Sequence, residues 1–295
     1  MSSATRPDRL TLTAFILVIL LGGSNSVAIR MSTHELAPFW GAFLRFAPSA
    51  LIFWLILFIR RMPLPGIRDV AVIALNGFLS TGVSFALLYW ALQTVPVSLA
   101  TVVISTSPLF TLILAVMHRL EKFRAQSLVG GLVAFFGLVI AVNAQPGSRA
   151  LLPSILALVF GALVAAEGTV IFKMYSLKSD SVIINAISMT AGSLFLVGSS
   201  FTAGEAWTLP TTTRGWGVLV YLVFGGSVVM FYMFVYVLSR WTASATSYAI
   251  LFFPLIATAL AALLTGETVT FTFLVGGAVV IIGVWIGAFY GTSGA

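Results

Sequence analysis

The stretch LVGGLVAFFGLVIA at residues 128–141 recurs 146 residues later, as LVGGAVVIIGVWIG at residues 274–287. Both copies begin with Leu-Val-Gly-Gly, and both place a further glycine at the tenth position. Apolar composition alone can align one leucine with another, but it does not bring three glycines into register. The two stretches therefore indicate an internal duplication of the chain.

The duplication extends upstream of the glycines. Residues 98–141 align on residues 244–287 without a gap. The identical pairs include Pro108 with Pro254, Leu109 with Leu255, Leu114-Ala115 with Leu260-Ala261 and Glu121 with Glu267. A proline and a glutamate that match in register strengthen the case for two copies of one unit.

The composition is that of a membrane protein. Of 295 residues, 60% are hydrophobic and only 8% are charged, with a mean hydropathy of +1.10. A soluble domain carries about a quarter charged residues. There are no cysteines, so disulfides and thiolate metal sites are excluded. The net charge of +7 is spread over short loops, which indicates membrane topology and lipid contact rather than nucleic-acid binding.

Apolar stretches long enough to cross a bilayer follow one another along the whole chain. They predict an all-α polytopic membrane protein with ten transmembrane helices. The first stretch has no cleavage motif and is interpreted as an uncleaved span. The predicted spans are roughly 10–31, 36–59, 69–92, 96–117, 125–144, 151–175, 181–203, 215–239, 243–264 and 269–290.

The basic residues predict the orientation, because cytoplasmic loops are enriched in Lys and Arg. With the N-terminus inside, three basic residues lie in outer segments: Arg30, Arg149 and Arg214. Eleven lie in inner segments: Arg6, Arg9, Arg60, Arg61, Arg68, Arg119, Lys122, Arg124, Lys173, Lys178 and Arg240. Both termini are therefore predicted to be cytoplasmic, in a bacterial inner membrane.

Ten spans divide into two units of five, at residues 1–146 and 147–295. Because five is odd, the second unit enters the membrane from the opposite side, and the repeats are inverted. Inverted repeats are typical of secondary transporters, whose substrate site lies near the midplane between the copies. A duplicated scaffold without transport, such as a channel, is the alternative.

Four segments carry a family resemblance: LEKFRAQSLVGGLVAFFGLVIA and LTGETVTFTFLVGGAVVIIGVWIG, with GGSNSVAIRM and AFLRFAPSAL near the N-terminus. They resemble the motifs of the EamA-type drug/metabolite transporters over essentially the whole chain, and the chain is most similar to the YddG-type amino-acid exporters. The resemblance implies ten helices, a central cavity and efflux from the cytoplasm. It does not specify the substrate.

Polar and aromatic residues recur along the faces of several spans. Together they predict a cavity suited to a small zwitterion with an apolar side chain. For any single residue, packing between helices is the simpler interpretation. The candidate cavity residues are Asn25, Asn76, Ser80, Ser84, Thr101, Ser105, Glu167, Tyr232, Tyr248 and Phe252.

Two ionisable residues lie well inside predicted spans, Arg45 and Glu167. Such residues face a partner or a wet cavity. Glu167 is interpreted either as a proton-coupling carboxylate or counter-charge, or as a structural partner. Arg45 could clamp a carboxylate, but pairing with Glu167 or with backbone carbonyls as a structural charge is favoured.

Two prolines, Pro108 and Pro254, are predicted to kink their spans and are candidate gate hinges, with a static kink as the alternative. Glu121 and Glu267 precede the fifth and tenth spans, where a carboxylate complements the helix dipole, and are interpreted as structural. The glycines of those two spans predict close helix packing and leave a homodimer open.

No enzymatic motif is present. The sequence has no Walker loop, no H-E-x-x-H and no G-x-S-x-G, and its two histidines lie near span ends. We therefore expect no catalysis, no metal and no cofactor. The expected partners are a small-molecule substrate and membrane lipid. The predicted function is export of amino acids, aromatic or otherwise apolar and neutral. A channel or a carrier of other metabolites or drugs is the alternative.

Overall fold

The computed structural model describes residues 9–120, 125–143, 151–175, 179–240, 243–264, 266 and 268–289. Within these residues the ordered elements are all helices, as the apolar runs predict. The first half comprises α1 (Arg9–Ser32), α2 (Pro38–Ile59), α3 (Ile67–Gly77), η1 (Phe78–Val83), α4 (Ser84–Ala91), α5 (Val97–Ile104), α6 (Ser107–Met117) and α7 (Ala125–Asn143).

The second half comprises α8 (Leu152–Met174), α9 (Ser181–Thr202), α10 (Thr213–Val223), η2 (Phe224–Val229), α11 (Met230–Arg240), α12 (Ala243–Leu264) and α13 (Phe271–Phe289). Helix starts follow local chemistry: Pro38 opens α2, where its missing N–H costs nothing. The Asp180 carboxylate accepts from the Val182 backbone N–H and caps α9.

Seven segments of the described residues are long and apolar enough to cross a membrane. Three shorter apolar helices follow within α7, α12 and α13. The seven are Arg9–Ser32, Pro38–Ile59, Ile67–Ala91, Val97–Met117, Leu152–Met174, Ser181–Thr202 and Thr213–Leu238. Ten complete spans therefore stay a prediction.

Apolar side chains cover the outside of the bundle as well as its centre. Phe46, Phe53 and Ile73 are fully buried, whereas Leu263 and Phe271 are largely exposed. Large exposed apolar surface is uncommon on a soluble monomer, and lipid is the solvent that suits it.

Elements of the two halves have matching bounds. Adding 146 to the bounds of α3, η1 and α7 gives those of α10, η2 and α13. The identity that first showed the duplication covers only its last two spans. The helix bounds extend the same offset to the third span of each half.

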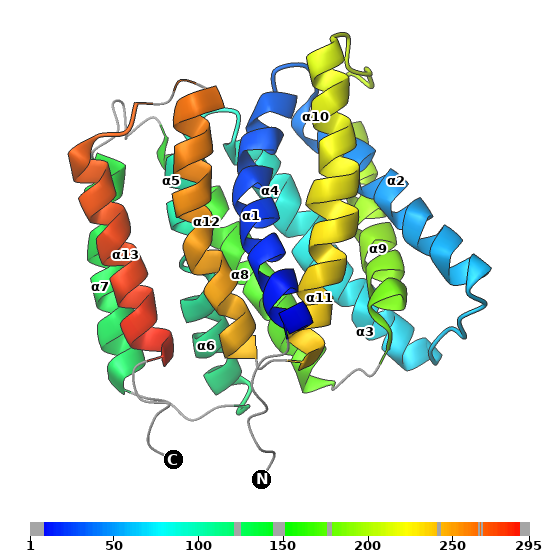
Figure 1. Ribbon diagram of the computed structural model, residues 1–295, viewed down its shortest axis with the longest axis horizontal. Coiled ribbons are helices and arrows are strands. Elements are labelled where there is room, and N and C mark those ends of the chain that lie inside the picture. Colours follow the sequence, from blue (N-terminus) through cyan, green and yellow to red (C-terminus); the bar gives the residue numbers. More distant parts are fainter. Residues whose placement is uncertain are drawn as a thin grey trace.

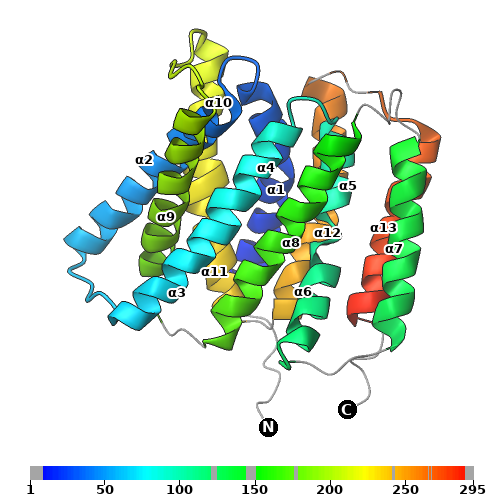
Figure 2. The same cartoon turned by 180° about the vertical axis from the view of Figure 1, so that it is seen from behind.

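The helices run roughly side by side through one bundle, with α7 and α13 paired at one edge (Figures 1 and 2). Glycines permit this close pairing. A Cβ at Gly137 would lie 2.5 Å from the Val280 nitrogen, and one at Gly276 would lie equally close to the Ala141 nitrogen. The glycines of the fifth and tenth predicted spans are thus packing sites within the chain.

The two halves also interleave away from the α7–α13 pair. Helix α2 of the first half packs against α9 of the second, and α9 in turn packs against α3 and η1. Helix α1 packs against α12 and α11. Residues of both halves therefore meet throughout the centre of the bundle.

Candidate functional site

One π-helical segment interrupts the third span of each half: η1 in the first half and η2 in the second. A π-helical turn widens the helix and shifts the hydrogen-bond ladder, and such segments often mark functional sites. Both segments contain small residues: FLSTGV in η1 and FGGSVV in η2. Close packing surrounds them, because a Cβ at Gly192 would lie 2.7 Å from the Cβ of Thr81 in η1.

The guanidinium of Arg45 on α2 is seated against η2. Its Nε donates to the Ser227 hydroxyl at 2.7 Å, and its Nη2 donates to the Gly226 carbonyl at 2.7 Å. The Ser227 hydroxyl in turn donates to the Leu222 carbonyl. The Arg45 side chain is 0% exposed, so a cation from the first half is buried against the π-helical segment of the second half.

Aromatic rings surround the same guanidinium. Its carbon lies 4.5 Å from the ring centre of Phe46 and 4.9 Å from that of Phe85. These two rings pack edge to face at 4.8 Å, and Phe231 of α11 lies 6.0 Å from each. Cation–π contacts compensate part of the hydration that a buried guanidinium loses.

A histidine and a glutamate join the halves elsewhere. His118 Nε2 lies 2.9 Å from Glu167 Oε1, linking the end of α6 to α8. The two side chains are 34% and 28% exposed, but Glu167 Oε2 is buried without a hydrogen-bond partner among the described residues. Glu167 therefore pairs with His118 and not with Arg45, one of the two partners predicted for that arginine.

At the other end of α8, Thr94 and Ser154 join the two halves. Their hydroxyl oxygens lie 2.8 Å apart, between the α4–α5 loop and the first turn of α8. Helix α8 is thus bonded to the first half in its first turn and again at Glu167, seven residues before its end.

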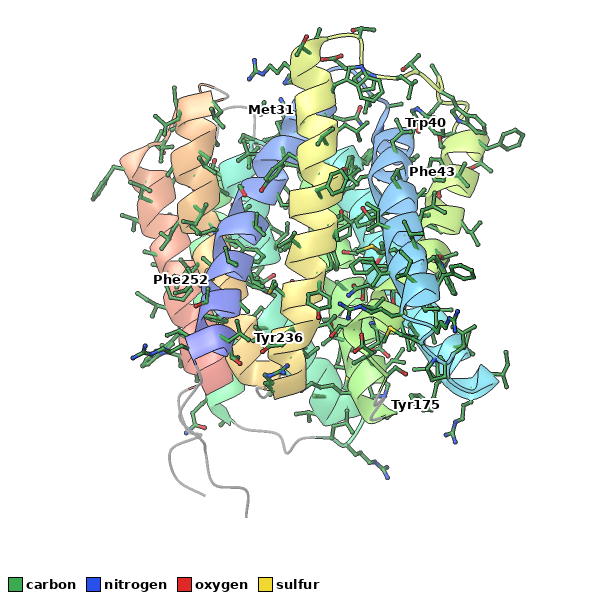
Figure 3. The ribbon with its side chains drawn as sticks, turned by 45° about the vertical axis from the view of Figure 1, so that its right-hand side comes forward. Met31, Trp40, Phe43, Tyr175, Tyr236 and Phe252 are labelled. Carbon is green, nitrogen blue, oxygen red and sulfur yellow. The ribbon has the colours of Figure 1, made fainter. Side chains whose placement is uncertain are left out.

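The loop between α9 and α10 is hydrogen-bonded to the start of α2 beside Trp40. The Glu205 carboxylate accepts from the Phe39 and Trp40 backbone N–H groups at the start of α2. The Trp40 ring stacks on Trp207 at 5.0 Å. Figure 3 shows Trp40 and Phe43 near one end of the bundle and Tyr175 near the opposite end.

Glu35, in the α1–α2 loop, makes the reciprocal contact with α10. Its carboxylate accepts from the Thr211 backbone N–H at 2.8 Å and bonds the Thr212 hydroxyl. The hydrogen bond from the Thr212 side chain, followed by that from the Thr211 backbone, lowers the pKa of Glu35 below its usual range. Glu35 also lines a cavity of about 460 Å³ with Met31, His34, Arg214 and Leu264.

Both halves of the chain match one family profile. The profile of the EamA-like transporter family matches residues 9–143 and again residues 152–288. The chain belongs to the EamA-like transporter family. The predicted family is thereby confirmed.

Curated relatives of this EamA-like transporter carry transporter names. The uncharacterized inner membrane transporter YedA of Escherichia coli K12 is 29% identical over 259 residues, covering 87% of this chain and 83% of its own. A probable amino-acid metabolite efflux pump of Salmonella typhimurium is 26% identical and covers 93% of each chain. The family indicates a transporter rather than an enzyme. The seven candidate spans indicate a multi-pass membrane protein.

A solved crystal structure shares the fold. It aligns with a TM-score of 0.69 over 96% of this chain and 99% of its own, at 16% sequence identity. At that identity the likeness concerns the fold alone.

The predicted polar stripe of the third span lies against α8. Asn76, Ser80 and Ser84 are all half-buried. Asn76 Nδ2 and the Ala165 carbonyl each lie 3.5 Å from the Ser80 hydroxyl, and Ser80 packs on Gly168. The stripe thus packs between the halves in this conformation.

The hydroxyls predicted on the fourth span bond their own helix. Thr101 donates toward the Val97 and Ser98 carbonyls, and Ser105 donates to the Val102 carbonyl. Both side chains are buried. Their protons are therefore used locally, although the oxygens can still accept.

The remaining candidates differ in their surroundings. Asn25 is buried on α1, and Tyr232 is half-buried against the core. Phe252 is 46% exposed on α12, which suits lipid contact better than a cavity wall (Figure 3). The Tyr248 side chain, Glu121 and Glu267 lie outside the described residues.

The two predicted kinks take different forms. The fourth span breaks into α5 and α6 at Ser105-Thr106, and Pro108 lies in the first turn of α6. Pro254 lies inside the continuous helix α12. Helix α2 contains a further proline, Pro48, that the duplication did not single out. The hinge role of Pro108 and Pro254 stays a prediction.

Proposed function

We propose that this EamA-like transporter is a secondary carrier that exports neutral amino acids with aromatic or other apolar side chains. In this proposal, ten spans form two inverted five-helix units, residues 1–146 and 147–295, and the substrate passes between them by alternating access. The carrier lies in the bacterial inner membrane with both termini in the cytoplasm.

The matching helix bounds carry the proposal. Elements α3, η1 and α7 recur as α10, η2 and α13 at one offset. Seven candidate spans and three shorter apolar helices suit ten crossings. An odd number of crossings per unit inverts the second copy, and two inverted copies can exchange conformations to open one side or the other.

Two separate contacts between the halves along α8 suit alternating access. The Thr94–Ser154 pair and the His118–Glu167 pair each join α8 to the first half. Breaking one pair while keeping the other would open the bundle at one end only.

The substrate class rests on relatives and on the buried residues. The relatives from Salmonella and Escherichia coli K12 that are named as probable amino-acid metabolite efflux pumps each cover 93% of this chain. The Arg45 guanidinium lies over the rings of Phe46 and Phe85, and polar atoms of Arg45 and Asn25 both lie close to Gly226. Such a mixture suits a small zwitterion with an apolar side chain.

Partners other than the substrate follow from the surface. Exposed apolar side chains suit membrane lipid. The glycine faces of α7 and α13 are used within the chain. A homodimer, if formed, therefore uses another surface.

Exchange kinetics test the proposal against a channel. Purified protein in liposomes would be loaded with unlabelled neutral amino acids, and uptake of the labelled amino acid would be followed. We expect saturable uptake that internal amino acid accelerates. Protein-free liposomes are the control. Unsaturable flux that internal substrate does not accelerate would support the channel, and exchange of unrelated solutes alone would support a carrier of other metabolites or drugs.

A further inference from the structure

Arg45 uses only part of its hydrogen-bonding capacity. A guanidinium carries five N–H donors. Its Nε and Nη2 each donate to η2, but its Nη1 is buried without a hydrogen-bond partner among the described residues. At least two donor hydrogens are thus left over at a position closed to water.

None of the carboxylates in the described part of the chain lies within ion-pair distance of this cation. Glu35 and Glu205 bond loop and helix-start groups, Asp180 caps α9, and Glu167 pairs with His118. A charged side chain inside a membrane protein is costly and generally pairs with another group or faces a pathway. Arg45 therefore has no partner carboxylate among the described residues.

Two more polar atoms beside Arg45 also lack a partner. Asn25 Oδ1 on α1 and the Tyr89 hydroxyl on α4 are buried and without hydrogen-bond partners among the described residues. A Cβ at Gly226 would lie 2.7 Å from Asn25 Oδ1 and 3.6 Å from Arg45 Nη2, so both atoms converge on one point of η2. The Tyr89 hydroxyl lies close to Arg45 and Ser32 and interacts with both, although it forms no hydrogen bond of standard geometry with either.

The three unpartnered groups have complementary chemistry. Arg45 Nη1 and the Tyr89 hydroxyl are donors that suit a carboxylate, and a guanidinium binds carboxylates well because their planar shapes match. Asn25 Oδ1 is an acceptor that suits an ammonium group. The Phe46, Phe85 and Phe231 rings supply an apolar wall beside them.

We propose that Arg45, Tyr89 and Asn25 bind the zwitterionic head of an α-amino acid, with the carboxylate on Arg45 and Tyr89 and the ammonium on Asn25. This inference rests on the proposed function and names the groups that select its substrate. The head site lies where α1, α2 and α4 of the first half meet η2 of the second.

The conformation described here has this head site closed. Arg45 and Tyr89 are 0% exposed, and Asn25 is 6% exposed. Entry of a ligand thus requires the surrounding helices to part, as alternating access does. A purely structural arginine would need no such opening and would be indifferent to substrate.

Tyr89→Phe distinguishes a substrate-binding role of the site from a purely structural one. It removes a hydroxyl that forms no hydrogen bond of standard geometry among the described residues, so the thermal stability of the substrate-free protein should change little. Arg45→Lys keeps the charge but loses the planar fork. Asn25→Leu removes the acceptor at similar size. Tyr175→Phe, on a half-exposed tyrosine at the opposite end of the bundle, is the matched control.

Binding would be measured by inhibition of exchange in liposomes. The probes are L-phenylalanine or L-leucine, whichever exchanges faster, together with its amide, its analogue without the amino group, and acetate. In the wild type we expect the amino acid to bind at least about tenfold more tightly than either analogue, as a hydrogen bond to a charged group would give.

Each variant should lose one kind of selectivity. Tyr89→Phe and Arg45→Lys should weaken binding of the amino acid about tenfold and leave binding of the amide unchanged. Asn25→Leu should erase the preference over the analogue without the amino group. Tyr175→Phe should behave as wild type.

Two results would overturn the inference while the proposed function stands. One is amino-acid exchange with unchanged selectivity in Tyr89→Phe and Arg45→Lys. The other is competition by acetate as strong as that by the amino acid, which indicates a simple anion site. If the wild type exchanges no amino acid at all, the proposed function fails first, and the inference fails with it.

Discussion

At the scale of single residues, the charged side chains divide between loops and the centre of the bundle. Glu35 and Glu205 tie helix starts together at one end. Arg45 and the His118–Glu167 pair lie where the two halves meet. Charges in a membrane protein are costly, so each such position implies a specific role.

Glu35 predicts a pH effect on stability. Its pKa is lowered in the folded protein, so its carboxylate stabilises the fold above the usual value of 4.5 and loses this effect as the pH falls through the lower folded value. Glu35→Gln should therefore lower the melting temperature at pH 7, and the difference should close in more acid solution. Asp69→Asn is the control. A difference that persists unchanged at pH 3 would contradict this account.

We predict that substitutions of His118 and of Glu167 affect export in the same way. Because the two side chains bond each other, Glu167→Gln and His118→Gln should change the pH dependence of export in the same way, and the double variant should add little. Export rates across a pH series in liposomes measure this. Pro48→Ala, away from the pair, is the comparison. Variants whose pH profiles match that of the wild type would exclude Glu167 as a coupling site.

Sequence patterns found the residues but not their partners. Arg45 and Glu167 stand out as charges in apolar runs. Arg45, however, bonds residues 181 and 182 positions away, and Glu167 bonds a histidine 49 positions away. No local period encodes such pairs, so His118 was assigned only to a span end. Asn25 was predicted as a cavity residue, whereas Tyr89 lacked any polar stripe that would mark it.

At the scale of elements, the glycines of α7 and α13 let these two helices pack closely. Sequence identity at an offset of 146 residues predicted that α7 and α13 are equivalent helices, and their bounds match at that offset. The π-helical segments could not be predicted, because FLSTGV and FGGSVV share no period that differs from an ordinary helix.

We predict that Gly283→Ala lowers the stability of the protein. A Cβ there would collide with the backbone of Ala134 on α7, and overpacking of this kind costs about 1–3 kcal/mol. Gly131→Ala is the matched control, since no atom lies within 4 Å of its added Cβ. Thermal melting in detergent compares the two. Equal stability of both variants would show that α7 and α13 do not pack as described.

We predict that Pro108→Ala slows the exchange of substrate across the membrane. The break between α5 and α6 suits a hinge, and alanine would let the helix continue through it. Pro254→Ala should also stiffen gating, but less, because α12 is already continuous. Exchange rates at equal expression measure both. Wild-type rates in both variants would exclude the hinge role.

At the scale of the whole molecule, transport by alternating access requires two halves that move against each other. Composition and the apolar runs predicted an all-helical membrane protein, and the duplicated motifs predicted its family. They could not show how the halves interleave, because contacts such as those of α2 with α9 join residues far apart in the sequence.

Distances across both ends of the bundle test alternating access most directly. The chain has no cysteine, so spin labels on Gln93 with Leu152, and on Met117 with Met174, would report the two ends separately. These pairs flank the Thr94–Ser154 and His118–Glu167 contacts. On addition of exchanged amino acid, we predict that one distance lengthens while the other shortens. Two distances that stay fixed, or that lengthen together, would contradict a carrier built from two alternating halves.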